Sequence, residues 1–120
     1  MTTYLVLLPG DESTWESATP EQRAAMYEIH GQFAAKLAER GHKITGGAEL
    51  THSRTTKQVR RDPAGNAVVS DGPFAETVEQ LTGFYVVESD DLDDLLQVSA
   101  MLANGGAPVE VRATVDQGGQ

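Results

Sequence analysis

The sequence contains no cysteine among its 120 residues. Disulfide bonds and thiolate zinc sites are therefore excluded, and the chain is compatible with a reducing cytoplasm. Its first residues include no basic segment, and the apolar run Tyr4–Leu8 is far shorter than the roughly 20 residues of a membrane-spanning helix. We expect a cytoplasmic protein with no signal peptide and no membrane partner.

The chain is also poor in basic residues, since nine Lys and Arg stand against eighteen Asp and Glu, giving a net charge of −9. Phosphate backbones are bound by clustered Lys and Arg. The only local cluster comprises Arg54, Lys57, Arg60 and Arg61. We therefore expect no nucleic-acid partner.

Neither a metal centre nor a cofactor site is indicated. The histidines His30, His42 and His52 are scattered along the chain, which makes a poor set of metal ligands. The pair Gly46-Gly47 is followed by no phosphate-loop lysine, and no dinucleotide fingerprint or nucleophile elbow is present. We expect His42 and His52 at the surface.

The length predicts one domain, which we place at residues 1–115, with residues 116–120 as a disordered tail. Its centre is the segment Asp71–Thr77. Asp-Gly-Pro excludes a helix or a central strand there, because glycine permits positive φ and proline lacks an N–H. Two interpretations stay open: Asp71 and Phe74 serve a ligand, or Asp71 caps the turn and Phe74 fills the core.

A long first helix is predicted from Pro20 to about Arg40. Thr19 at the N-cap, Pro20 at the first position and Gln22 at N3 agree as start signals, and Gly41 is a natural stop. His30 lies on the flank of the apolar stripe that this helix buries. The stripe comprises Met26, Ile29, Phe33 and Leu37.

Strands and irregular segments surround this helix. Residues 11–18 are expected to form a polar loop around Trp15, and paired glycines in a strand mark a bulge or a close approach at Gly46-Gly47. A hairpin is predicted with arms Arg54–Arg61 and Asn66–Ser70, the first arm being an exposed edge. The other predicted elements are strands at Tyr4–Leu8, Lys43–Leu50, Thr82–Glu88 and Pro108–Ala113, and a second helix starting at Ser89–Leu92 that buries Leu92, Leu95, Leu96 and Leu102.

The order β–α–β, hairpin, β–α–β predicts an α+β fold: one antiparallel sheet of the ferredoxin-like type with two helices on one face. The strands Tyr4–Leu8 and Thr82–Glu88 are apolar on both sides, which is typical of strands buried on both faces. The face without helices therefore needs a cover. The simplest cover is the same face of a second copy of the chain, packed sheet against sheet, and we therefore predict a homodimer.

The segment Asp71–Thr77, followed by Glu79–Leu81 and Gly83–Tyr85, resembles the signature of the DGPF-type branch of the YCII-related (YciI-like) superfamily. The resemblance implies a dimeric ferredoxin-like α+β barrel, in agreement with the argument above. Relatives place a histidine on the first helix and an aspartate near it, facing a pocket between sheet and helix. His30 matches that helix position, and Asp71 is the candidate for the acid.

The resemblance also suggests a reaction class. At least one relative is a dehydrochlorinase acting on a substituted hydroquinone, and the fold is similar to lactone isomerases. We hypothesise a cofactor-independent lyase or isomerase acting on a small organic ligand, in which His30 moves a proton and Asp71 orients it. The predicted binding residues are Tyr4, Gly47, Phe74, Tyr85 and Arg112.

Two alternatives to catalysis stay open. The first is a non-catalytic dimeric module that binds a ligand or a regulatory protein, since many relatives lie beside or are fused to extracytoplasmic-function sigma factors. The second is a scaffold in which His30 and Asp71 are both structural. Most relatives have no assigned reaction, so the resemblance alone does not decide among these.

Overall fold

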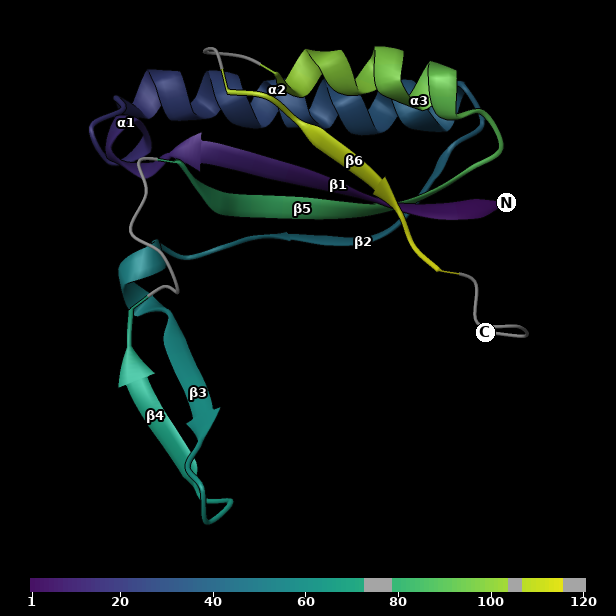
Figure 1. Ribbon diagram of the computed structural model, residues 1–120. Coiled ribbons are helices and arrows are strands. Elements are labelled where there is room, and N and C mark those ends of the chain that lie inside the picture. Colours follow the sequence, from purple (N-terminus) through teal and green to yellow (C-terminus); the bar gives the residue numbers. More distant parts are fainter. Residues whose placement is uncertain (73–78, 104–106, 116–120) are drawn as a thin grey trace.

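The computed structural model describes residues 1–72, 79–103 and 107–115. Within these, the central layer is an antiparallel sheet with the strand order β2-β5-β1-β6, and a second layer of helices lies over one face (Figure 1). This order agrees with a ferredoxin-like fold, and the predicted α+β class is confirmed. The strands of the sheet are β1 (Thr2–Asp11), β2 (Lys43–Glu49), β5 (Glu79–Ser89) and β6 (Glu110–Ala113).

The long helix α2 (Pro20–Glu39) begins and ends as the sequence predicts. Thr19 Oγ1 accepts a hydrogen bond from Gln22 N at 3.1 Å, and Gln22 Oε1 accepts one from Thr19 N at 2.9 Å, which together form a capping box. At the other end Gly41 has φ of 86°, and His42 N donates to Leu37 O at 2.9 Å. A Schellman motif therefore closes the helix.

The expectation of a loop over residues 11–18 is wrong, because a short helix, α1 (Glu12–Glu16), forms there. Asp11 is its N-cap and accepts from Ser13 N at 2.9 Å. Arg23 on α2 donates to Trp15 O at 3.1 Å and Glu16 O at 3.2 Å, and its guanidinium lies 5.3 Å from the centre of the Trp15 ring. A cation at the carbonyl end of α1 stabilises a helix too short to persist alone.

The hydrophobic core lies between the sheet and the helices. Helix α3 (Leu92–Ser99) buries Leu95, as predicted, but Leu92 and Leu96 are 40% and 44% exposed. Leu96 lies about 100° around the helix axis from Leu95, so the buried face instead continues through Val98. The fully buried residues are Val6, Phe33, Leu37, Val87 and Leu95, joined by Val98 and Leu102.

The opposite face of the sheet has no covering layer within the described residues (Figure 1). Side chains alternate along a strand, so Leu5 and Leu7 point away from the helix side on which Val6 is buried. Their register partners on β5 are Val86 and Phe84. We call these four half-exposed side chains the bare face.

The predicted hairpin is confirmed, but it forms a separate two-stranded sheet and does not extend the central one. Its strands are β3 (Lys57–Arg61) and β4 (Ala67–Asp71), and it projects from the side of the body that carries no helix (Figure 1). Asp62 organises its turn by accepting hydrogen bonds from Ala64 N at 3.0 Å and Asn66 N at 2.8 Å. Among the described residues, no helix is long and apolar enough to cross a membrane.

Candidate functional site

His30 and Tyr85 form the candidate site, between the middle of α2 and strand β5. His30 Nδ1 lies 2.6 Å from Tyr85 Oη, and the two rings are 5.8 Å apart, tilted by 30°. Phe33, one turn further along α2, packs on the other side of Tyr85 with ring centres 5.1 Å apart. Since Phe33 is fully buried, the inner wall of this site is rigid. The sequence prediction that His30 lies at the helix–sheet boundary is thus confirmed.

Burial controls the proton equilibria of this pair. It lowers the pKa of His30, an effect that the negative charge of Glu49 partly opposes, and it raises the pKa of Tyr85. At neutral pH the imidazole is therefore neutral and the phenol protonated. A neutral imidazole carries one N–H donor and one acceptor nitrogen. The 2.6 Å contact then has two tautomers, with either Nδ1–H donating to Tyr85 Oη or Tyr85 O–H donating to Nδ1.

A second tyrosine carries the polar network outward along α2. Tyr27 precedes His30 by one turn, and its hydroxyl donates to the Glu49 carboxylate on β2 at 2.9 and 3.0 Å. This hydrogen bond raises the pKa of Tyr27. Its ring meets Trp15 edge-on, with centres 5.6 Å apart. The Tyr27 ring and the Glu49 carboxylate therefore lie one turn before His30 along α2, and the Glu49 charge acts on His30.

Gly47 explains how β2 comes close to Tyr85. The pairing of β2 with β5 slips between Ile44 and Gly46, which places Gly47 opposite Tyr85. A Cβ on Gly47 would lie 2.6 Å from Phe84 O and 3.2 Å from Tyr85 Cδ1, and its φ is +151°. Only glycine fits this position, and the predicted bulge is confirmed.

Other predicted binding residues lie elsewhere in the sheet. Tyr4 is on the helix-covered face and packs against the hydrophobic core. Arg112 on β6 is opposite Leu5 and, because side chains alternate along a strand, it points to the same side of the sheet as the bare face. The structure therefore does not bring Arg112 to His30.

Asp71 lies at the base of the hairpin, where its carboxylate pairs with Lys57. The hydrogen bond and positive charge of Lys57 lower the pKa of Asp71. The hairpin and α2 are on opposite sides of the sheet (Figure 1), and His30 has Tyr85 as its partner. The structure does not bring Asp71 and His30 together, and Phe74 lies outside the described residues.

His42 was expected at the surface, and that expectation is wrong, since the residue is only 6% exposed. Its Nδ1 lies 2.8 Å from Ser89 Oγ and its Nε2 lies 2.7 Å from Asp94 Oδ2. Ser89 is itself 1% exposed, so this histidine–serine–aspartate set offers no accessible nucleophile. We interpret it as a structural link that joins the start of β2 to the end of β5 and the start of α3.

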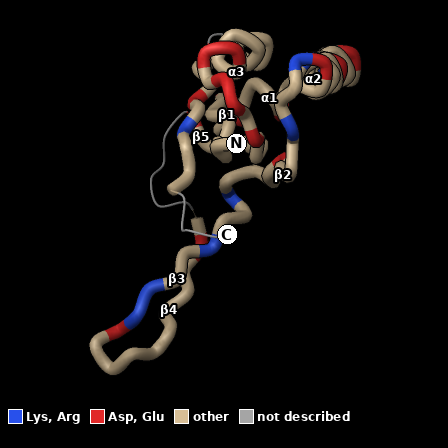
Figure 2. The backbone as a smooth tube through the Cα atoms, turned by 90° about the vertical axis from the view of Figure 1, so that its right-hand side faces the viewer, with Lys and Arg blue, Asp and Glu red and all other residues tan. Residues whose placement is uncertain are grey.

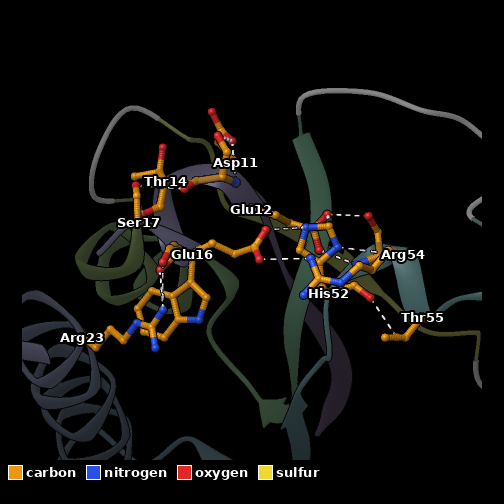
Figure 3. A network of polar contacts seen from close by, with 12 residues as sticks. Asp11, Glu12, Thr14, Glu16, Ser17, Arg23, His52, Arg54 and Thr55 are labelled. Atoms are coloured by element: carbon orange, nitrogen blue, oxygen red, sulfur yellow. Dashed lines mark hydrogen bonds and ion pairs between the residues drawn. The ribbon is translucent and has the colours of Figure 1, made fainter. Parts of the chain in front are cut away.

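His52 belongs to a second polar network, which connects α1 to the short turn Ser53–Thr55 (Figure 3). His52 Nε2 lies 3.0 Å from Glu16 Oε1, and Arg54 Nη1 lies 3.0 Å from Glu16 Oε2. Glu12 accepts from Ser53 N at 2.6 Å. The described residues hold no group of three or more His, Cys, Asp or Glu side chains that could bind a metal ion.

The comparison with known families agrees with the motif resemblance. The YCII-related domain family matches the chain over residues 2–115. The chain belongs to the YCII-related domain family. An uncharacterized protein of Rhizobium meliloti (strain 1021) is 36% identical to this YCII-related domain over 101 residues, which cover 84% of this chain and 80% of the relative. Neither match names an activity, so the function is argued from the site.

Proposed function

We propose that this YCII-related domain is a cofactor-independent lyase or isomerase in which His30 transfers the proton. The observation that carries the proposal is the 2.6 Å contact between His30 Nδ1 and Tyr85 Oη. It holds a partly buried imidazole, with a lowered pKa, against a phenol. Such a pair supplies a base that is unprotonated at neutral pH and a phenol that holds the imidazole in place.

One of the two tautomers leaves His30 able to accept a proton. When Nδ1–H donates to Tyr85 Oη, Nε2 of His30 is a base that accepts a proton from a carbon or oxygen acid. Within the described residues this Nε2 makes no hydrogen bond. The imidazolium that results is favoured by the negative charge of Glu49, which acts to raise the His30 pKa. Returning the proton elsewhere on the substrate completes an isomerisation, and loss of a leaving group completes an elimination.

Tyr85, rather than Asp71, is the orienting partner that the described geometry supports. Asp71 keeps its predicted role only if another arrangement brings it to His30, because its carboxylate is engaged by Lys57. The aromatic surroundings, with Tyr27 near the approach, favour a small cyclic or aromatic substrate. The absence of cysteine favours a cytoplasmic location.

Deuterium exchange tests the proposal without knowledge of the complete reaction. Lactones, phenols and substituted hydroquinones are incubated with the protein in D2O, and loss of carbon-bound proton signals is followed by NMR. His30→Gln should reduce catalysed exchange by about 100-fold or more, while the matched control His52→Gln should retain it. Tyr85→Phe should keep part of the activity and change its pH profile, as a positioning residue would.

The pH dependence has a definite sign. Because burial lowers the His30 pKa below its ordinary value of 6.5, the exchange rate should stay constant from neutral pH to below 6.5 and fall only when the pH passes the folded pKa. A folded His30→Gln variant with wild-type exchange would overturn the proposal.

The alternative is a non-catalytic dimeric module that binds a ligand or a regulatory protein. Association with a sigma factor is one such regulatory role. The bare face favours it, because half-exposed Leu5, Leu7, Phe84 and Val86 form a contiguous apolar patch that a second copy can cover. A thermal-shift screen separates the two functions. Ligands that stabilise wild type and His30→Gln equally, with no exchange in either, indicate a binding module.

A further inference from the structure

The hairpin is an arm that stands away from its own body. We define the arm as residues 57–71, comprising β3, its turn and β4. The radius of gyration of the chain is 16.8 Å, against about 14 Å for a compact domain of this length. The described hydrogen bonds and ion pairs of the arm, such as Lys57 with Asp71 and Asn66 with Asp62, all join residues of the arm itself. Nothing in the described body holds the arm in place by polar contact.

The arm also exposes apolar surface that its own fold does not use. Val59 and Val69 are register partners, so they lie side by side on one face, and they are 68% and 62% exposed. Val68, on the other face, is 47% exposed. An isolated two-stranded hairpin is at best marginally stable in water. A projecting hairpin with an aliphatic pair on its surface is therefore typical of an element that packs against another molecule.

The charge of the arm indicates the kind of molecule against which it packs. The arm carries three of the nine cationic residues and two of the eighteen acidic ones, a net charge of +1, so the rest of the chain carries −10. Basic residues lie along β3, whereas α3 carries Asp93 and Asp94 and α2 carries three acidic and two basic residues (Figure 2). The arm of one copy thus complements the acidic body of another.

We propose that the arm is a clasp that docks on the flank of a second copy of this chain. The proposal rests on the dimer of the preceding section, in which the bare faces pack together. Sheets packed face to face lie about 10 Å apart, and a five-residue strand spans about 17 Å. The arm projects from the bare-face side (Figure 1), so it passes the partner's sheet and reaches its acidic helix layer. The valine pair provides apolar contact, and Arg61, on the same face of the arm as the valine pair, faces the acids.

Sedimentation equilibrium measures the contribution of the arm. The double variant Val59→Ser/Val69→Ser should raise the dimer dissociation constant at least tenfold, equivalent to about 1.4 kcal/mol, because two exposed apolar side chains lose their cover. Val115→Ser is the matched control, since Val115 is 82% exposed and lies outside the arm. It should leave the constant unchanged. Arg60→Glu/Arg61→Glu should weaken the dimer most at low salt.

Photo-crosslinking locates the contact directly. Since the chain has no cysteine, Val68→Cys provides a single thiol for a benzophenone label on the arm. In an equal mixture of 14N and 15N protein, crosslinked peptides of mixed isotope report contacts between copies. We expect mixed-isotope crosslinks from the arm to the partner's sheet edge or helix layer.

The outcomes separate the arm from the dimer. A wild type that stays monomeric at all concentrations overturns both. A dimer whose dissociation constant is unaffected by the arm variants, with crosslinks only within one copy, overturns the clasp and leaves the sheet-to-sheet dimer intact. Arm labels that crosslink only to added RNA or to a different protein also overturn it.

Discussion

At the scale of single residues, His42 shows what a local pattern does not reveal. Its partners Ser89 and Asp94 are 47 and 52 residues away in the chain, so no spacing rule relates them. Arg40 also pairs with Asp94, and the hydrogen bonds of Arg40 and His42 hold the pKa of Asp94 well below its usual range. The position after Gly41 predicted a surface residue, whereas the fold places the ring beneath the start of α3.

Replacement of His42 by alanine should lower the free energy of unfolding by about 3 kcal/mol, because it leaves a cavity and removes the buried contacts of the imidazole with Ser89 and Asp94. Urea denaturation at neutral pH measures the effect. His52→Ala is the control, since His52 makes partly exposed ion pairs, which contribute up to about 1 kcal/mol, and one exposed hydrogen bond from Arg54 N. Equal losses in the two variants would contradict a structural role for His42.

At the scale of elements, the sequence predicted well what local chemistry determines. The capping box at Thr19 and the positive-φ stop at Gly41 involve neighbours in the chain, and both ends of α2 are confirmed. Helix α1 was missed because its stability comes from Arg23 and not from its five residues. The stripe of α3 was assigned to leucines, whereas burial follows the helix angle and selects Val98 over Leu96.

In the candidate site, too, the sequence predicted the features that local chemistry determines and missed a contact between distant segments. The sequence predicted His30 on the flank of its helix and a bulge at Gly46-Gly47, which depend on helical spacing and on glycine. It did not predict that Tyr85 would be the hydrogen-bond partner of His30, because the two are 55 residues apart. The partner depends on the register of β5, which the hydrophobic pattern of that strand does not specify residue by residue.

Gly47→Ala should destabilise the β2–β5 pairing by about 2 kcal/mol or more, because the added Cβ would lie 2.6 Å from Phe84 O. Gly46→Ala is the matched control, since its Cβ would make an ordinary 3.6 Å contact with Val86. Amide hydrogen exchange on β5 and thermal melting measure both variants. A Gly47→Ala protein as stable as Gly46→Ala would show that β2 does not need this close approach.

At the scale of the whole molecule, the bare face determines how stability should depend on concentration. If a second copy covers Leu5, Leu7, Phe84 and Val86, the melting temperature should rise with protein concentration. Phe84→Lys should remove that dependence, because a charge would be buried in the interface. Calorimetry over a hundredfold concentration range tests this. The dimer would be excluded if the wild-type melting temperature did not change with concentration and the dilute Phe84→Lys variant melted at that same temperature.

The position of β1 also has a consequence for synthesis. This apolar strand, the first to be made, lies in the middle of the sheet between β5 and β6, and its partners are residues 79–89 and 110–113. At translation rates of about 5–20 residues per second, β1 waits roughly 4 to 15 seconds for β5 alone. Pairing so distant in sequence is slow. The sheet therefore forms only after residues 110–113 have been synthesised, and until then Tyr4–Leu8 is the segment most exposed to aggregation and to chaperones.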